Sequence, residues 1–394
     1  MRRLAAILLV LAAAACDDRL KAGRCEKDSD CESGMTCVQD MIAGAYHRCA
    51  TSDGGAAGVG GSNPDVMKPE CTDDLQCPAE RPTCGATGAC VPCAAGSTVC
   101  ATLHASTPVC GGSGACVECA SSADCSATAK PTCDTQSNTC KACSADTDCA
   151  GRLGPGVCMA HQDGRCASEA ETIYVQQTAA CVATADPVAG TATTPFCGLD
   201  KGAVALSATR RLFVVRGTVQ GTAWTLQGTA TDPQISVVGQ ETAVLAGGAS
   251  PGLRVMGANV FVRDLIVRRS EQIGISATSG SRLRLTRVSV ENNGGGGILL
   301  DGAAFEIADS KITGNGPGTA GATTWGGVLV QTTPASGPAK LDHVTVSGNT
   351  GPGVSCASPI EGIAVSATGN APVDIGPTCG ITSCGAPGAT CGAM

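Results

Sequence analysis

Four residues whose side chains could do chemistry recur at one position of a repeated pattern in the C-terminal half of the chain. Asp264, Arg287, Asp309 and His343 each stand six residues before a member of a recurring polar column. Carboxylates and an imidazole gathered on one face could serve as the proton-transferring groups of an enzyme. Because acidic and basic residues alternate along the column, the same side chains could instead form a surface ladder of ion pairs. The alternation favours the ladder, and a catalytic cluster is the alternative.

The polar column closes the repeated segments DLIVRRS, RVSVENN, DSKITGN and HVTVSGN. Its members are Ser270, Asn293, Asn315 and Asn349, with Asn370 in a degenerate fifth copy. Apolar and polar residues alternate within each copy, which is the period of a strand with one buried face. A unit of about 22 residues cannot bury such a face alone, so the copies are expected to stack as coils of a solenoid.

A second outward row stands nine residues before the same column. It consists of Phe261, Arg284, Glu306, Lys340 and Glu361. Its charges alternate as well, so in a stack of coils about 4.8 Å apart each would face an opposite charge. This row therefore also predicts a surface ladder.

One interval of the repeat contains an insertion. Asn315 and Asn349 are 34 residues apart, whereas the neighbouring intervals are 22 and 21 residues. The excess includes GPGTAGATTWGG, which places Trp325 near an extruded loop. Loops that leave a rigid scaffold often bind ligands, so Trp325 is a candidate contact residue. A buried tryptophan that fills the end of its coil is the alternative.

The starts of the coils share a second feature, a glycine followed by Ile or Val. These glycines are Gly274, Gly297, Gly327 and Gly353. Together with the Asn column, they resemble the right-handed parallel β-helix repeats of the pectate-lyase-like superfamily. The resemblance implies an all-β solenoid over residues 167–394, entered through a strand near Ile173 and a capping helix. We expect Cys181 and Cys197 to pair at this entry.

The resemblance also implies what an enzyme of this fold would need. Polysaccharide lyases of the superfamily hold calcium with several acidic groups and use Arg or Lys as a base, and related hydrolases use paired aspartates. Here the acids are interleaved with arginines, and the domain has no Arg-Ile-Lys triplet. We therefore expect recognition or adhesion, with an extracellular polysaccharide or another surface partner as the ligand, and no cofactor or metal. The alternative is a polysaccharide lyase or glycoside hydrolase, and only a lyase would require calcium.

Cysteines dominate the segment before the solenoid, in four units of four. They are Cys71, Cys77, Cys84, Cys90; Cys93, Cys100, Cys110, Cys116; Cys119, Cys125, Cys133, Cys140; and Cys143, Cys149, Cys158, Cys166. So dense a framework predicts disulfides formed in an oxidising compartment, paired within each unit, with the connectivity left open. Zinc sites and a thioredoxin-like redox role are weaker alternatives. The recurring Cys-x-x-Cys junctions resemble the Cys-rich repeat of myxococcal type in exported bacterial proteins, which implies no activity.

The N-terminus predicts export. Arg2 and Arg3 precede a short apolar run, which is typical of a signal peptide over residues 1–15. Cleavage before Cys16 would match a bacterial lipoprotein whose cysteine carries the lipid, although Ala13 replaces the usual leucine. Of 27 cysteines, removing Cys16 leaves an even number for pairing. We expect a membrane anchor at the cell envelope, most simply the outer membrane, with plain secretion as the alternative.

Two further segments complete the organisation. Residues 16–50 form a short cysteine unit of their own, residues 51–70 a Gly- and Ala-rich linker, and residues 71–166 the four repeats. Four terminal cysteines are expected to staple the last coil and the tail, namely Cys356, Cys379, Cys384 and Cys391. A net charge of −8 and a pI near 5.1 exclude a nucleic-acid partner, because such sites need clustered Lys and Arg.

Overall fold

The computed structural model describes residues 35–39, 47–51, 69–221, 224–229, 231–249 and 251–381. The chain divides into one unit up to Lys68 and a second from Pro69 onwards. In the first unit, β1 (Met35–Gln39) pairs antiparallel with β2 (His47–Thr51). The predicted signal segment, Cys16, most of the linker, Cys384 and Cys391 lie outside the described residues. None of the described helices is long and apolar enough to cross a membrane.

Each cysteine unit is a small two-stranded hairpin fastened by two disulfides. The hairpin strands are β3 (Thr83–Cys84) with β4 (Cys90–Val91), β5 (Val109–Cys110) with β6 (Cys116–Val117), and β7 (Thr132–Asp134) with β8 (Thr139–Lys141). In the fourth unit the backbones of Cys158 and Cys166 form an isolated antiparallel β-bridge. Short helices precede them: η3 (Asp74–Gln76), α1 (Val99–Leu103), η4 (Ser122–Asp124) and η5 (Asp146–Cys149). These units contain few large apolar side chains, so sulfur forms their cores.

The disulfide connectivity is the same in all four units. The first cysteine pairs with the third and the second with the fourth, for example Cys71 with Cys84 and Cys77 with Cys90. The bridged cysteines are 13 to 17 residues apart, and closing such a loop stabilises the fold by about 3 kcal/mol per bridge. The hairpin turn contains a left-handed residue, Gly88, Gly114, Asn138 or Gly164. Its carbonyl accepts a hydrogen bond from the first cysteine of the unit.

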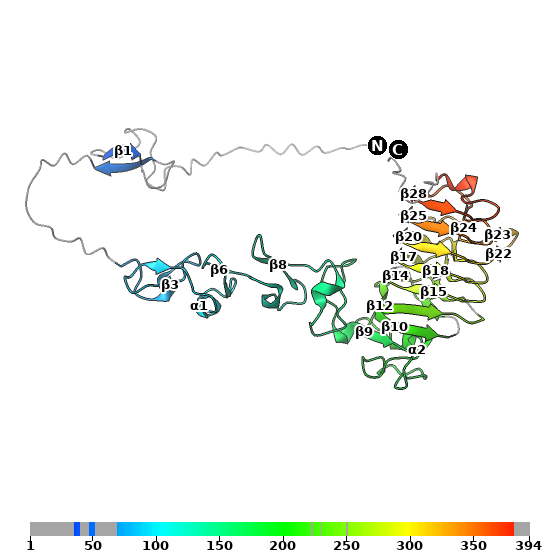
Figure 1. The fold of residues 1–394 in the computed structure, drawn as a ribbon, viewed down its shortest axis with the longest axis horizontal. Coiled ribbons are helices and arrows are strands. Elements are labelled where there is room, and N and C mark those ends of the chain that lie inside the picture. Colours follow the sequence, from blue (N-terminus) through cyan, green and yellow to red (C-terminus); the bar gives the residue numbers. More distant parts are fainter. Residues whose placement is uncertain are drawn as a thin grey trace, which may run out of the picture. The chain divides into compact units, whose positions relative to one another are not determined.

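The solenoid begins with η6 (Glu169–Glu171), β9 (Thr172–Val175), the short helix α2 (Leu199–Gly202), η7 (Ala203–Ala205) and β10 (Leu212–Gln220). A disulfide joins Cys181 to Cys197 at this entry. The long strand β12 (Ile235–Ala246) then pairs in parallel with β10 and turns the corner between two faces of the solenoid. Figure 1 shows the strands stacked from the entry, in green, to the last coil, in red.

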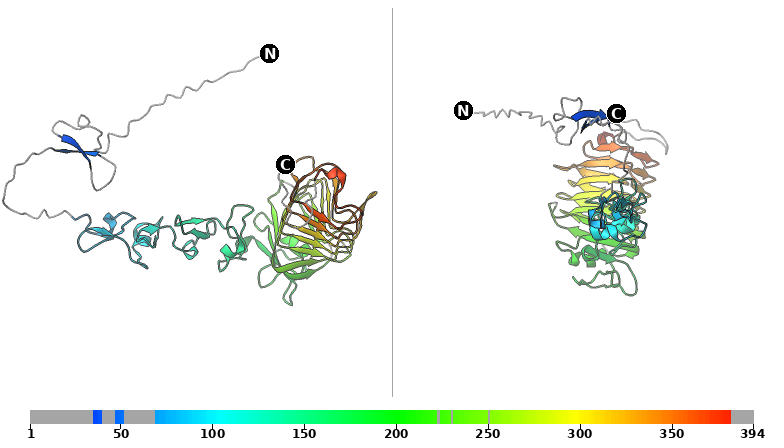
Figure 2. Two further views of the ribbon diagram at one scale, coloured as in Figure 1. Left: turned by 45° about the horizontal axis from the view of Figure 1, so that its top comes forward. Right: turned by 90° about the vertical axis from the view of Figure 1, so that its left-hand side faces the viewer.

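Parallel strands form the three faces of the solenoid, and β12 joins the first two faces into one sheet. The first face contains β14 (Asn259–Arg263), β17 (Arg282–Thr286), β20 (Ala304–Ala308), β25 (Ala339–Asp342) and β28 (Glu361–Ile363). The second face contains β15 (Ile266–Arg268), β18 (Ser289–Glu291), β21 (Lys311–Thr313), β26 (Thr345–Ser347) and β29 (Ser366–Thr368). The third face contains β11 (Trp224–Gln227), β13 (Leu253–Met256), β16 (Ile275–Thr278), β19 (Ile298–Asp301), β24 (Val328–Thr332) and β27 (Val354–Cys356). The views of Figure 2 show the faces around one interior.

Inward side chains of the three faces stack into one continuous apolar core. It runs from Ile173 at the entry to Cys379 in the 3-10 helix η8 (Pro377–Cys379), where a disulfide links Cys379 to Cys356. The period-2 alternation in the sequence produces this arrangement, since every second side chain of a strand points inward.

The predicted Asn column forms a buried ladder after the second face. The Asn293 side chain donates to Oδ1 of Asn315 at 2.9 Å, and Asn315 donates to Oδ1 of Asn349 at the same distance. The ladder continues to Asn370. The left-handed residue of the turn stands immediately before the ladder, as with Asn292 at φ 55°. The ladder residue itself turns its amide inward, where it satisfies buried backbone groups of adjacent coils.

Candidate functional site

The fourth cysteine unit packs against the solenoid. Its apolar residues Val157, Met159 and Ala167 share a core with outward side chains at the start of the solenoid. Those side chains are Tyr174, Leu212, Val214 and Val238. The outward face of β9, β10 and β12 is therefore apolar and covered, whereas farther along the first face the outward residues are charged.

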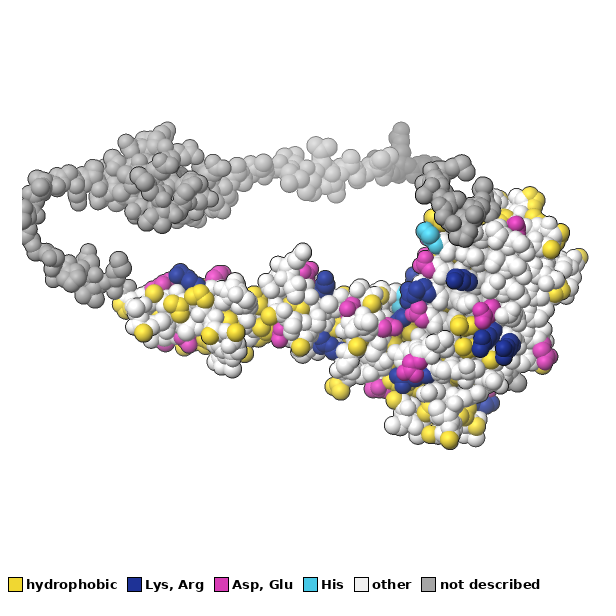
Figure 3. Space-filling model, viewed as in Figure 1, with side chains coloured by type: hydrophobic (Ala, Val, Ile, Leu, Met, Phe, Trp, Pro, Cys, Tyr) yellow, Lys and Arg dark blue, Asp and Glu magenta, His cyan; other side chains and the backbone are white. Residues whose placement is uncertain are grey.

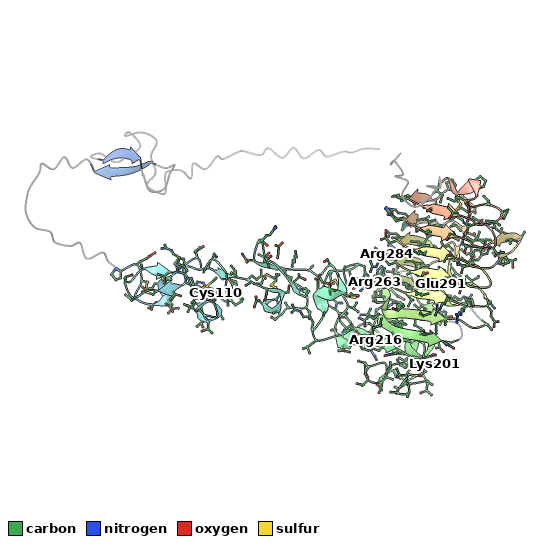
Figure 4. The ribbon with its side chains drawn as sticks, in the orientation of Figure 1. Cys110, Lys201, Arg216, Arg263, Arg284 and Glu291 are labelled. Atoms are coloured by element: carbon green, nitrogen blue, oxygen red, sulfur yellow. A yellow bond between two sulfur atoms is a disulfide. The ribbon has the colours of Figure 1, made fainter. Side chains whose placement is uncertain are left out.

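A buried ion pair fixes the edge of this contact. Arg263, at the end of β14, is 7% exposed and makes two hydrogen bonds to the carboxylate of Asp146, at 2.9 and 2.7 Å. The guanidinium also donates to the carbonyl of Cys158 at 3.2 Å. Figure 4 labels Arg263 where the fourth unit meets the strands of the first face. Two parallel bonds to one carboxylate give this contact a defined orientation.

An imidazole lies beside the ion pair. His161 of the fourth unit stacks on the ring of Phe261, with 3.8 Å between centroids, and its Nε2 lies 2.9 Å from the hydroxyl of Ser236. Burial, together with the charges of Arg263 and Arg284, lowers the pKa of His161 to about 4. The ring is therefore neutral at neutral pH, which suits its place between an aromatic ring and two guanidinium groups.

A cleft of about 410 Å³ opens between the fourth unit and the first face. The fourth unit contributes Asp146 and His161 to its lining, and the solenoid contributes Phe261, Arg263, Asp264, Arg284, Thr286 and Arg287. The cleft thus contains two of the four residues that the sequence proposes as a catalytic cluster. It also contains Asp146 and His161, which lie outside the predicted solenoid domain and were not among the predicted site residues.

The two predicted residues in the cleft neutralise each other. Nε and Nη2 of Arg287 each lie 2.7 Å from an oxygen of Asp264, and Arg263 also donates to Asp264 at 2.5 Å. Burial alone would raise the pKa of Asp264, but the hydrogen bonds from Arg287 and Arg263 outweigh it and hold the pKa below the usual value. The carboxylate of Asp264 is therefore ionised and already occupied by two guanidinium groups.

The other two predicted residues do not line the cleft. His343 is exposed, and its Nδ1 lies 2.7 Å from the carboxylate of its neighbour Asp342. Asp309 lies near enough for its charge to help raise the pKa of Arg287, an effect smaller than that of the hydrogen bond that Arg287 donates to Asp264. The structure therefore brings Asp264 and Arg287 together and leaves Asp309 and His343 along the corner of later coils.

The four residues share a backbone conformation rather than a pocket. Asp264, Arg287, Asp309 and His343 have φ between 48° and 56°, and Ala364 has φ 50° at the same position of the last coil. Each is the first of two residues that form the corner between the first and the second face. Asp and His are enriched at left-handed positions. Part of the recurrence in the sequence is thus conformational.

The second predicted row lies on the outside of the first face, as expected. Arg284 is 3.2 Å from Glu306, and Lys340 is 3.5 Å from Glu361 and 3.2 Å from Asp342. The guanidinium of Arg284 also lies over the ring of Phe261, at 5.6 Å. Figure 3 shows basic and acidic side chains intermixed on this part of the solenoid. The charges of the row are therefore paired along the stack.

Trp325 ends a hairpin of β22 (Gly318–Ala320) and β23 (Thr323–Trp325). Its side chain is fully buried against Gly296 and Gly318, and its Nε1 has no hydrogen-bond partner among the described residues. A Cβ at Gly296 would lie 2.5 Å from the indole, so the glycine makes room for it. The hairpin exposes Thr323 and Thr324, whereas the indole fills the coil, which is the alternative that the sequence leaves open.

The position of Asp146 in the cysteine repeat could have identified it as a structurally important residue. The third residue after the first cysteine caps the backbone N–H of the third cysteine in three of the units. Asp74 accepts from Cys84 at 2.7 Å, Ser122 from Cys133 at 3.1 Å, and Asp146 from Cys158 at 2.7 Å. The carboxylate of Asp146 therefore caps the backbone N–H of Cys158 within its own unit and also binds Arg263. No comparable sequence signal marks His161.

The carboxylates of the site do not form a metal-binding cluster. Within the described part of the chain, every close group of three or more possible metal ligands consists of cysteines that are in disulfides. The acids of the first face are instead interleaved with Arg and Lys.

Comparison with known proteins identifies the architecture. Residues 243–373 match the family model described as right handed beta helix region. The predicted fold class, an all-β right-handed solenoid preceded by a disulfide-rich region, is therefore confirmed. Among solved structures the chain is similar to pectate lyase Pel9A, with 13% identity over 50% of this chain and 69% of that chain and a TM-score of 0.26. No curated protein matches the sequence at a significant level.

Proposed function

We propose that this protein recognises an acidic polysaccharide without cleaving it, and that the first face of the solenoid and the adjoining cleft form the binding surface. The β-helix domain supports a carbohydrate-related role. The observation that carries the proposal is that the carboxylates of this face are in ion pairs with basic side chains. Asp264 pairs with Arg263 and Arg287, Glu306 with Arg284, and Asp342 with Lys340. A carboxylate engaged by a guanidinium is a poor general acid, since the ion pair lowers its pKa.

The cationic partners remain accessible at the surface. The Arg287 side chain is 54% exposed and that of Arg284 is 32% exposed. Guanidinium groups bind carboxylates and sulfates through paired hydrogen bonds, so these side chains can exchange part of their contact with Asp264 or Glu306 for a ligand anion. Parallel strands spaced about 4.8 Å apart present such groups along a line, which suits an extended chain.

The second candidate function is a polysaccharide lyase or glycoside hydrolase that uses Asp264, Arg287, Asp309 and His343. It draws on the close contact between Asp264 and Arg287, because lyases of this fold use an arginine or lysine as base. Against it, the four residues lie on a left-handed corner, and only two of them line the cleft.

We also propose that the chain is exported and anchored through a lipid on Cys16. The ten described disulfides support an oxidising location. That the cysteine repeats belong to the myxococcal type also stays a prediction. Metabolic labelling with a fatty acid of the wild-type chain and of Cys16→Ser tests the anchor: equal labelling of both would contradict it.

The test of function is a binding screen of the full chain against acidic and neutral polysaccharides, with and without calcium. We expect binding to acidic polymers that weakens with added salt and does not require calcium. Arg287→Gln and Arg284→Gln should each weaken binding several-fold, whereas Arg254→Gln, on the third face, should not. Binding to neutral polymers alone, or equal binding by all variants, would contradict the proposed surface.

A further inference from the structure

The docked segment of the fourth unit borders a second cleft. Residues Met159, Gln162 and Arg165 form one wall of a cavity of about 290 Å³, and the entry of the solenoid forms the other. His161, between them in sequence, lines the first cleft. The contact between the fourth unit and the solenoid thus creates two separate clefts, and the second contains none of the residues of the proposed polysaccharide surface.

Most charged side chains of the second cleft form ion pairs with one another or with a neighbouring residue. Arg165 makes two hydrogen bonds to Glu171, at 2.6 and 2.5 Å, and a third to Asp163 at 3.0 Å. Burial alone would raise the pKa of Glu171, but the bonds from Arg165 and from the backbone of Ser168 lower it overall. This acid is therefore an ionised and fully occupied partner of Arg165.

Arg211 is the exception. Its guanidinium lines the cleft and makes no ion pair with any described residue. Its guanidinium makes one weak hydrogen bond within the described part of the chain, from Nη1 to the carbonyl of Ser207 at 3.4 Å, and its Nε is buried with no acceptor. The backbone N–H of Thr229 donates to the carboxylate of Asp232 and lowers its pKa, and the positive charge of Arg211 lowers this pKa further without a direct contact.

A buried guanidinium N–H without an acceptor is unfavourable, and the charged group makes the deficit larger than a neutral donor would. In the first cleft each of the three arginines has a carboxylate partner, whereas Arg211 has none among the described residues. The hydroxyl of Thr209 and the side-chain amides of Gln162 and Gln234 also line the cleft. They are neutral groups that hydrogen-bond sugar hydroxyls.

We propose that the second cleft binds the carboxylate of a uronic acid residue through Arg211. The choice of a sugar acid rests on the proposed function, whereas the choice of a carboxylate rests on the unpaired guanidinium. The carboxylate would pair with the guanidinium as Asp264 pairs with Arg287, and the hydroxyls of the sugar ring would meet Thr209, Gln162 and Gln234. The site recognises a single residue or chain end, because its volume is that of a small-molecule pocket.

The experiment uses the full chain with trigalacturonate as the probe and its methyl ester as the uncharged control. Binding is measured by calorimetry for the wild type, Arg211→Gln, Arg211→Lys and Arg254→Gln. Arg254 is an exposed arginine on β13 of the third face that lines neither cleft, so its variant removes the same charge away from both proposed surfaces. In parallel, the Nε–H resonance of Arg211, assigned by its loss in Arg211→Gln, is followed by NMR during titration with trigalacturonate and with acetate.

We expect Arg211→Gln to weaken trigalacturonate binding about tenfold or more, with Arg211→Lys intermediate, Arg254→Gln unchanged and the methyl ester bound weakly. The Arg211 resonance should shift with both acids. If the wild type and Arg211→Gln bind trigalacturonate equally, the site is overturned while the proposed function stands. If the wild type binds no polysaccharide, the proposed function falls, and the acetate titration decides the site: a shift of the Arg211 resonance supports it, and no shift overturns it.

Discussion

Arg263 and Asp146 are 117 residues apart in the sequence and form a two-bonded ion pair that joins the last cysteine unit to the first face of the solenoid. The same carboxylate caps Cys158 within its own unit. The disulfide repeats and the β-helix therefore meet at a specific contact with its own apolar core, and the clefts of about 410 and 290 Å³ lie along that contact.

Replacing Arg263 by methionine should loosen this contact. The change leaves Asp146 without its guanidinium partner, and breaking a buried pair in this way costs on the order of 2–4 kcal/mol, reduced here because Asp146 is 34% exposed. Limited proteolysis should then cleave between the fourth unit and the solenoid faster than in the wild type, and the urea midpoint should fall. Arg282→Met is the control, and an equal loss of stability in both would contradict the role of the pair.

Acid should weaken the same contact through His161. The unfolded chain binds the His161 proton below a pKa near 6.5, whereas the folded chain binds it only below about 4. The unfolded state therefore holds more protons in this window, and stability present above pH 6.5 is lost as the pH falls to about 4. Allowing for partial solvent screening, the loss is on the order of 2 kcal/mol.

Several charged groups surround His161, so the measurement must isolate its contribution. Arg263 and Arg284 oppose its protonation and Asp163 favours it, while Asp146, Asp264 and Arg287 line the same cleft. The urea midpoints of the wild type and His161→Phe are compared at about pH 7 and about pH 4.5, because the carboxylates common to both proteins contribute alike. An equal decrease in both proteins would show that His161 is not the titrating group.

The Asn ladder should be a principal source of stability in the solenoid. Asn315 is fully buried, donates to Val290 and Asn349, and accepts from both the backbone and the side chain of Asn293. Asn315→Ala leaves these buried groups unsatisfied, at about 1–3 kcal/mol for each group. The free energy of unfolding should fall by several kcal/mol, whereas Thr324→Ala at the exposed hairpin should change it little. A small effect of Asn315→Ala would mean that water replaces the amide.

Trp325 should stabilise the coil without contacting a ligand. Trp325→Ala opens a cavity beside Gly296 and should cost about 3–5 kcal/mol. Polysaccharide affinity, measured well below the melting temperature of the variant, should stay within about twofold of the wild type, since the indole is buried. A large loss of affinity in a folded variant would restore Trp325 as a contact residue.

Local features of the sequence were sufficient to predict the solenoid but not the docking. Alternation around Leu283 and Leu285 predicts a strand with one buried face, and the spacing from Asn293 to Asn315 predicts the stack, because both patterns repeat within one coil. The two outward rows of alternating charges could be predicted from their fixed spacing to the same Asn column. The contact of Arg263 with Asp146 could not be predicted in this way, since it depends on how two separately patterned segments meet.

The shared spacing of Asp264, Arg287, Asp309 and His343 was misleading in one respect. It indicates a common place in the coil, which the structure shows, but this place is a left-handed corner, and only neighbouring coils bring such residues into contact. The sequence left burial of Trp325 open as an alternative, because an insertion in a repeat can extend outward or fold back on the coil.

Recognition without turnover is tested most directly by the chain length of polygalacturonate after incubation with the full chain and calcium, measured beside the binding isotherm of the same sample. We predict saturable binding, weakened by Arg287→Gln, with no shortening of the polymer and no unsaturated product. Shortening that requires calcium and is lost in Asp264→Asn or Arg287→Gln would show that the protein cleaves its ligand and would identify the cleft as a lyase active site.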